Sequence, residues 1–364
     1  MKFSKALLHL ARRSIEANIR DHLSYPMKVT LNITDKCNSR CLTCNIWQLK
    51  AKDELTSEEW RAFFRKSNRI SWLDMIGGEI FLRKDFFEIA DAALTSCRNL
   101  FLFHFVTNAL CSNTVEVAER IFSKHAPPLT LITVSLDGPP ELNDRIRGVP
   151  GNFDKSVNVF QAFRRRNSGR FRVFLGMTLS GHNVRAFPET LEAVRDRIPD
   201  IRPDEFHLNI AQLASYYVND NDPAMKLAEA AEIEAAFQDY RARVGRSGLS
   251  PISHLESEYQ RLGREFARTR RCPSPCRSMD VSCFIQPRGI VHPCLMWDRP
   301  VGGLREHDYD LKSVWTSAEA RAVRAQIASE NCPHCWTPCE AYQTIIANTL
   351  RAPRDAASRT SIPA

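Results

Sequence analysis

The stretch that decides the fold is Cys37-Asn38-Ser39-Arg40-Cys41-Leu42-Thr43-Cys44, which follows the extended apolar run at residues 27–33. Three thiolates with this CxxxCxxC spacing can hold three irons of a four-iron, four-sulfur cube and leave the fourth iron open to another ligand. A zinc knuckle or a chance group of buried cysteines is the alternative. Zinc sites normally use four ligands in closely spaced pairs, and no nearby His or Cys completes such a set here. The spacing therefore favours an iron–sulfur cluster.

The composition indicates a protein with a sizeable core from a reducing compartment. The chain has 364 residues, 43% of them hydrophobic, which is enough for one large domain and a smaller one. No apolar run approaches the length of a membrane span and no signal peptide precedes the motif, so twelve cysteines favour metal sites and a cytoplasmic location over disulfides. The net charge of +8 is expected to be a solvated arginine-rich surface, and no nucleic-acid partner is expected.

From residue 27 to about 213, extended apolar segments alternate with helical ones. The predicted strands are 28–33, 70–76, 100–107, 129–136, 171–179 and 205–213. The predicted helices lie near 56–67, 84–97, 113–125, 152–166, 188–198 and 224–244. Six strand–helix repeats predict parallel strands joined by right-handed crossovers. The predicted fold class is therefore α/β, a partial (β/α)6 TIM-like barrel.

Short motifs follow the first four predicted strands. The cysteine loop follows the first, Gly77-Gly78-Glu79 the second, Thr107-Asn108 the third and Ser135-Leu136-Asp137-Gly138 the fourth. Barrels of this type carry their chemistry on the loops at the carboxyl ends of the strands. A single Gly-Gly-Glu is a weak signal because paired glycines often form a turn, but four motifs at four successive strand ends are a strong one.

These motifs resemble the signature of the radical S-adenosylmethionine (radical SAM) enzymes. The resemblance implies a [4Fe–4S] cluster on Cys37, Cys41 and Cys44 whose open iron chelates SAM. The SAM-binding residues it implies are Gly77, Gly78, Glu79, Thr107, Asn108, Ser135 and Arg147. Glu79 would accept from the SAM ammonium, and Arg147, within the family-like segment 143–148, would meet a carboxylate. Asn143 stands where relatives often have His, so no role is transferred to it.

A second cysteine-rich region follows a polar segment at 245–271, for which we expect a connector with a short helix. Residues 281–285 and 290–292 predict a hairpin with its turn at 288–289. The region resembles the SPASM or twitch extension of radical SAM enzymes, a small C-terminal Fe–S extension of hairpin plus helix. The resemblance implies one auxiliary [4Fe–4S] cluster on Cys276, Cys294, Cys332 and Cys335. Cys339 is a further predicted metal ligand, Cys272 and Cys283 stay open as ligands, and a zinc ribbon is the alternative.

The expected division of the chain has four parts. An amphipathic N-terminal helix occupies 1–26, the barrel 27–245, the auxiliary-cluster domain 246–350 and a disordered tail 351–364. The apolar side of the N-terminal helix, with Leu8, Ile15 and Ile19, is expected to pack on the domain. Contact of this basic helix with a membrane surface is the alternative.

The resemblance implies reductive cleavage of SAM to a 5′-deoxyadenosyl radical that abstracts hydrogen from a substrate, with electrons from a flavodoxin or ferredoxin type donor. The main expectation is an oxidoreductase-like oxidation or rearrangement of a small hydroxylated or sugar-like molecule, because a single auxiliary cluster suits a two-electron oxidation. Maturation of a ribosomal peptide by crosslinking or epimerisation is the alternative, although no leader-binding domain is expected before Cys37. A non-catalytic zinc-binding scaffold is a further alternative. No catalytic residue is assigned beyond the cluster.

Overall fold

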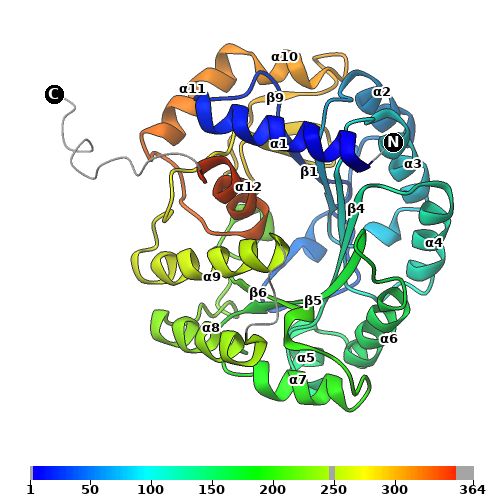
Figure 1. Ribbon diagram of the computed structural model, residues 1–364, viewed down its shortest axis with the longest axis vertical. Coiled ribbons are helices and arrows are strands. Elements are labelled where there is room, and N and C mark those ends of the chain that lie inside the picture. The colour runs from blue at the N-terminus through cyan, green and yellow to red at the C-terminus, as the bar shows by residue number, and fades with distance from the viewer. Residues whose placement is uncertain (1–2, 246–250, 350–364) are drawn as a thin grey trace.

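A computed structural model describes residues 3–245 and 251–349 of the chain. Strands from both parts belong to one nine-stranded sheet (Figure 1). The strand order is β6-β5-β4-β3-β2-β1-β7-β8-β9. Neighbouring strands from β1 to β6 are parallel, and β7 adds a further parallel strand beside β1. Strands β8 and β9 then continue the sheet in antiparallel fashion. The predicted tail at 351–364 lies outside the described residues.

The six predicted barrel strands and the predicted hairpin are all present, which confirms the α/β partial barrel with a C-terminal extension. The barrel strands are β1 (Lys28–Asn32), β2 (Trp72–Ile76), β3 (Leu102–Thr107), β4 (Leu129–Ser135), β5 (Phe171–Leu179) and β6 (Phe206–Ile210). The extension contributes β7 (Ser282–Ile285), β8 (Ile290–His292) and β9 (Gly302–Gly303). The hairpin turns at Gly289, whose φ of 84° suits glycine.

Helices follow the barrel strands and cover the outer face of the curved sheet (Figure 1). They are α2 (Ser57–Lys66), α3 (Phe86–Ser96), α4 (Thr114–Lys124), α5 (Pro140–Arg147), α6 (Asn152–Arg164), α7 (Phe187–Arg195) and α8 (Ala230–Val244). The remaining helices are α1 (Phe3–Ile19), α9 (Pro251–Thr269), α10 (Leu311–Trp315), α11 (Ala318–Ala328) and α12 (Pro338–Asn348). Figure 1 shows α8, α9 and α12 on the side where the ring of strands is open, and contacts join α9 to both of the others.

The two faces of each barrel strand differ in chemistry. On β2 and β3, Leu73, Met75 and Phe103 are buried in the core shared with the outer helices. The alternating residues Asp74 and His104 face the inside of the barrel and line a cavity there. The inside of this barrel is therefore partly polar, in contrast to closed TIM barrels, in which packed apolar side chains fill the interior.

The expectation that α1 packs through its apolar side is wrong. Leu8, Ile15 and Ile19 are exposed, Ile19 to 78%, while Ala6 and Ala17 are buried. Ala17 shares a small apolar cluster with Ala347 of α12, and the Asn18 side chain donates to the Ile346 carbonyl at 3.2 Å, so the contact with α12 determines which face is buried. No helix within 3–245 and 251–349 has the length and apolarity needed to cross a membrane.

The expected connector at 245–271 is also wrong, because most of it is one long helix. Helix α9 has 19 residues and buries Tyr259, Leu262 and Phe266. These apolar side chains recur every three or four positions, a spacing that the many charged residues of the segment obscured. The predicted boundary at 245/246 thus falls between α8 and α9, and β7 beyond it pairs with β1.

Candidate active site

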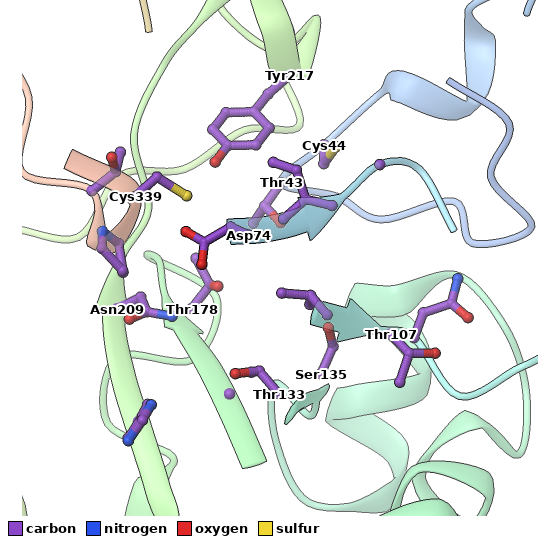
Figure 2. A pocket seen from close by; sticks show the side chains of 18 of the residues that line it. Thr43, Cys44, Asp74, Thr107, Thr133, Ser135, Thr178, Asn209, Tyr217 and Cys339 are labelled. Carbon is purple, nitrogen blue, oxygen red and sulfur yellow. The ribbon is translucent and has the colours of Figure 1, made fainter. Parts of the chain in front are cut away.

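A cavity of about 330 Å³ opens inside the ring of strands. Its deep wall consists of alternating strand residues, including Lys28, Asp74, His104, Thr133, Thr178 and Asn209. Its rim includes Cys37, Cys41, Cys44, Gly77, Gly78, Thr107, Asn108, Ser135 and Arg147. Figure 2 shows Cys44, Thr107 and Ser135 around this space, with Cys339 across it. The structure thus brings most residues predicted for SAM and the first cluster to one cavity.

The cysteine loop has little regular structure of its own and is held by later loops. The N–H groups of Arg40 and Leu42 donate to the carbonyls of Arg147 and Ile146, at 3.0 and 2.8 Å. The Glu79 N–H donates to the Lys36 carbonyl at 2.7 Å. These bonds connect the cysteine loop to the Gly-Gly-Glu turn and to the end of α5.

Glycines permit both of these contacts. A Cβ on Gly78 would lie 2.3 Å from the Lys36 carbonyl oxygen and 2.8 Å from the Cys37 Cβ. A Cβ on Gly148, which has a φ of 66°, would lie 2.4 Å from the Arg40 carbonyl oxygen. Gly78 was predicted as a SAM-binding residue, and the structure shows that it also allows close approach of the backbone to the cysteine loop.

A second attachment joins the cysteine loop to the segment after β6. The Asn45 N–H donates to the Tyr217 carbonyl at 2.7 Å, and the Asn219 side chain donates to the Thr43 carbonyl at 2.8 Å. Asn219 also donates to the Gln212 carbonyl at 3.1 Å. The loops after β1 and β6, which are far apart in the strand order, therefore form one wall of the cavity.

Arg147 places a buried positive charge beside the cysteines. Its guanidinium donates to Asp137 at 3.2 Å. Burial opposes the charge, but the Cys41 thiolate and the Asp137 carboxylate together raise the pKa of Arg147. The carboxylate that Arg147 meets in this structure therefore belongs to Asp137. Its buried Nε has no hydrogen-bond partner within the described residues, so the predicted SAM contact stays a prediction.

Glu79 joins the ends of β2 and β3. Its buried carboxylate accepts from the Phe81 N–H at 3.2 Å, from the Thr107 hydroxyl at 3.1 Å and from the Asn108 N–H at 2.6 Å. Burial raises the pKa of Glu79 to about 7, against the effect of these hydrogen bonds. Glu79, Thr107 and Asn108 are thus fixed relative to one another, while contact of Glu79 with the SAM ammonium stays a prediction.

Five C-terminal cysteines lie close enough to influence one another. The charges of Cys276 and Cys335 both raise the pKa values of Cys272 and Cys294, and the charge of Cys276 also raises the pKa values of Cys332 and Cys335. A hydrogen bond from Cys272 lowers the pKa of Cys276, which favours a thiolate there. The four residues predicted for the auxiliary cluster are therefore together in space, although 59 positions separate Cys276 from Cys335 in the chain (335 minus 276).

Comparison with known proteins agrees with this geometry. The model of the radical SAM superfamily matches residues 31–194, and that of SPASM, an iron–sulfur cluster-binding domain, matches residues 276–336. The chain belongs to the radical SAM superfamily and carries a SPASM domain. The radical SAM domain implies a [4Fe–4S] cluster that binds SAM, and the SPASM domain implies auxiliary iron–sulfur cluster binding.

Several curated relatives are similar to this chain over part or most of their length. The sporulation killing factor maturation protein SkfB of Bacillus subtilis is 23% identical over 84% of this chain and 68% of its own. The Fe-coproporphyrin III synthase of Methanosarcina barkeri is 28% identical over 79% of this chain and 73% of its own. The PqqA peptide cyclase of Rhizobium meliloti is 30% identical over 41% of this chain and 40% of its own.

Solved structures show the same fold. The crystal structure of Streptococcus suis SuiB bound to S-adenosylmethionine aligns with a TM-score of 0.59 at 16% identity. The alignment covers 86% of this chain and 72% of SuiB. At this level of identity the likeness shows the fold alone.

The backbone around the predicted cluster ligands of this radical SAM chain fits thiolate ligands. At six of the predicted ligand cysteines the N–H group two residues later donates toward the sulfur, as Ser274 also does at Cys272. The pairs are Ser39 to Cys37, Ile46 to Cys44, Ser278 to Cys276, Met296 to Cys294, His334 to Cys332 and Thr337 to Cys335. Burial favours the neutral thiol, and each of these N–H groups opposes it by lowering the pKa. Such hydrogen bonds to sulfur are a usual means by which proteins stabilise and tune iron–sulfur clusters.

Cys283 and Cys339 lie outside this arrangement. Cys283 is buried in β7, where burial raises its pKa, and no described residue donates a backbone N–H to its sulfur. Cys339 lies on the cavity wall, and its carbonyl accepts from the buried Lys28 ammonium at 2.6 Å. Within the described residues no three His, Cys, Asp or Glu side chains converge as they would around a single metal ion. A four-iron cube is larger than one ion, so its ligands stand further apart.

A polar network at the bottom of the cavity was not predicted from the sequence. Asp74 pairs with Lys28 at 2.9 Å and with His104 at 3.2 Å, and the other nitrogen of His104 lies 3.1 Å from the Thr133 hydroxyl. Burial opposes ionisation of Asp74, but Lys28 and His104 outweigh it and lower the pKa of Asp74. None of these residues lies at the carboxyl end of its strand, where the motifs were sought, so only their alternation with apolar neighbours could have indicated them.

We predict that Gly148→Ala weakens the cysteine loop much more than Gly151→Ala. Both glycines have positive φ, 66° and 73°, so each alanine carries a left-handed strain of about 1–2 kcal/mol. Only the alanine at 148 also collides with the Arg40 carbonyl, since nothing lies within 4 Å of the position at 151. Iron content after anaerobic reconstitution, with the melting temperature, measures the difference. Equal iron content in the two variants would contradict the role given to Gly148.

We predict that Glu79 makes this protein less stable as the pH rises from about 5 to about 7. Its ordinary pKa is 4.5 and its pKa in the fold is about 7, so over this range the unfolded chain loses a proton that the folded chain keeps. The free energy of unfolding then falls, by at most about 3 kcal/mol, and levels off above pH 7.

The matched variant for this prediction is Glu79→Gln, which cannot titrate. Denaturant unfolding of SAM-free protein at several pH values should show a shallower decline for the variant. Some decline should remain, because burial also raises the pKa of Glu256 to about 7 and of Glu340 to about 8. Parallel pH profiles for wild type and variant would contradict the role given to Glu79.

Proposed function

We propose that this radical SAM enzyme modifies a peptide. The alternative weighed from the sequence, peptide maturation, has better support than the main expectation of a small hydroxylated or sugar-like substrate. The relatives include a maturation protein and a peptide cyclase, and SuiB, which shares the fold, has also been crystallised bound to its precursor peptide SuiA. None of the relatives described above is named for a sugar-like substrate.

The observation that carries this proposal is the exposed apolar surface on the loops that border the cavity, of which Trp47 lines the cavity itself. Trp47, Leu49 and Leu213 belong to the few large apolar side chains that are exposed in the described structure. The loops that carry them are joined through Asn45 and Asn219 and border the cavity. A small polar solute enclosed in the cavity would leave these side chains in water, whereas the side chains of a longer peptide would cover them.

The synthase among the relatives provides a second candidate substrate. Fe-coproporphyrin III synthase is named for an iron porphyrin, which is also a large and partly apolar molecule. The exposed Trp47 and Leu49 suit such a macrocycle as well as a peptide. Substrate trials therefore include coproporphyrin beside peptides.

The bound cofactors would supply one-electron cleavage of SAM and a radical that abstracts hydrogen, while the chain's own residues bind and orient. We propose that Cys37, Cys41 and Cys44 hold the SAM cluster and that Cys276, Cys294, Cys332 and Cys335 hold one auxiliary cluster. Gly77, Gly78, Glu79, Thr107, Asn108, Ser135 and Arg147 would surround SAM. We propose the barrel at 27–245 and the auxiliary-cluster domain at 246–350 as the working division of the chain. Electron supply by a flavodoxin or ferredoxin type protein is part of the same proposal.

We predict that the two groups of cysteines can be separated by iron content and SAM cleavage. Wild type should hold about eight irons, as two four-iron clusters require. The variant Cys37→Ala/Cys41→Ala/Cys44→Ala should lose about half of the iron and all 5′-deoxyadenosine formation after dithionite reduction. Cys294→Ala should also lose about half of the iron but should keep some cleavage of SAM without product.

The matched control for both variants is Cys283→Ala, a buried cysteine outside the proposed ligand set. It should keep the iron content and 5′-deoxyadenosine yield of wild type. Iron loss in Cys283→Ala equal to that in Cys294→Ala would overturn the auxiliary ligand set. Cleavage of SAM by the triple variant would overturn the first cluster, and zinc in place of iron would support the scaffold alternative.

The substrate is tested separately, with short peptides encoded beside the gene. Peptide modification is expected to appear as a change in peptide mass, or as deuterium uptake from heavy water if the change is an epimerisation, together with 5′-deoxyadenosine. If coproporphyrin is turned over while every peptide stays unchanged, the proposed peptide substrate is wrong and the substrate is a porphyrin.

A further inference from the structure

Two buried side chains on the cavity wall have hydrogen-bonding groups that nothing in the described protein satisfies. Gln212, just after β6, is 7% exposed, and Thr337, at the start of α12, is 3% exposed. The Gln212 Nε2 and the Thr337 hydroxyl are buried without a partner among the described residues, and both residues line the cavity. Buried polar groups are nearly always paired, so an unpaired couple beside a cavity indicates a ligand.

The orientation of Gln212 is set by the SPASM domain. Its Oε1 accepts from the Trp336 N–H at 3.1 Å, and its carbonyl accepts from the Asn219 side chain at 3.1 Å. With the oxygen committed to an N–H group, the amide nitrogen is the unpaired end. Gln212 therefore presents a donor, and the residue that fixes it directly follows Cys335.

Thr337 occupies a capping position but does not cap its helix. A threonine at the N-cap normally accepts from a backbone N–H in the first turn, yet the Thr337 side chain makes no such bond. The capping threonine of α2, Thr56, makes this bond to the Glu59 N–H at 3.2 Å. The Thr337 hydroxyl is thus available to donate or accept at the cavity wall.

The surroundings favour a carbonyl and an N–H group as the matching ligand. The amino end of α12 reaches the cavity through Pro338 and Cys339, and the positive end of a helix dipole attracts a carbonyl oxygen. Asn209, which lies on β6 and lines the same cavity, has a buried Oδ1 without a partner among the described residues. This oxygen can accept from an N–H group. Donor, hydroxyl and acceptor together match the alternating groups of a peptide backbone.

We propose that Gln212 and Thr337, with Asn209, form a subsite that binds a main-chain amide of the peptide substrate. Gln212 donates to the substrate carbonyl, Thr337 shares that carbonyl or donates to the next, and Asn209 accepts from the substrate N–H. The inference rests on the proposed function, because it presumes a peptide in the cavity. It adds that Gln212 links substrate binding to the loop of Cys332 and Cys335 through Trp336.

The test uses reconstituted, SAM-bound protein and a mixed pool of N-acetylated tripeptide amides in anaerobic equilibrium dialysis. Gln212→Glu keeps an oxygen for the Trp336 N–H but replaces the cavity donor by a carboxylate oxygen, so retention of the pool should fall at least tenfold. Thr337→Val removes only the hydroxyl and should lower retention about fivefold. Because the hydroxyl does not cap α12, the melting temperature of Thr337→Val should match that of wild type.

The matched control is Gln161→Glu, a partly exposed glutamine on α6 outside the cavity lining, which should retain the pool as wild type does. Wild-type retention by both Gln212→Glu and Thr337→Val would overturn the subsite while leaving a peptide substrate in place. The subsite is also overturned if these variants alter only the electron paramagnetic resonance of the auxiliary cluster, since the pair would then face the cluster. If wild type retains no peptide but retains myo-inositol or coproporphyrin, both the subsite and the peptide function fail.

Discussion

The structure of the site depends on the backbone contacts that shape the cysteine loop. A loop with three ligands for one cluster must hold them in a fixed arrangement, yet residues 35–45 contain no helix or strand that would do so. Carbonyl and N–H groups of the Gly-Gly-Glu turn, of the end of α5 and of the segment after β6 supply this shape instead. Gly78 and Gly148 are needed because the approaching backbones leave no space for a side chain. Motifs that look like separate SAM-binding signatures in the sequence are therefore also parts of the support for the cluster.

The interior of the barrel shows a second constraint, which is the burial of charge. Lys28 and Asp74 lie fully inside the protein, where an unpaired charge would cost several kcal/mol. Their 2.9 Å contact, with His104 and Trp72 also donating to Asp74, satisfies both charges. An apolar pair of similar volume would stabilise the fold at least as well.

The sequence predicted those features that depend on local patterns. The strands were found from short apolar runs and the hairpin from its turn at Gly289, because neighbouring residues alone determine both. The grouping of Cys276 with Cys335 came from the family resemblance, and the structure adds the N–H groups that distinguish these sulfurs from Cys283. The buried face of α1 could not be predicted, since it depends on the contact of α1 with α12, in which Ala17 and Ala347 share one apolar cluster. The sequence placed Gln212 near the pocket as a strand-end residue, but the unpaired state of its Nε2 could not be predicted, because it exists only once Trp336 is placed beside it.

The pairing of β1 with β7 relates the two cysteine groups to each other. Lys28 stands opposite Ser282 and Leu31 opposite Ile285, so both strands run in the same direction and end at the same edge of the sheet. Cys37 follows β1 directly, and Cys294 follows the hairpin that β7 begins. Strand β8 then returns antiparallel to β7, with His292 opposite Phe284, so Cys294 lies toward the end of the sheet where β1 begins. The two cysteine groups thus lie toward opposite ends of the paired strands, and the cavity wall contains both Cys37 and Thr337, which follows the second group.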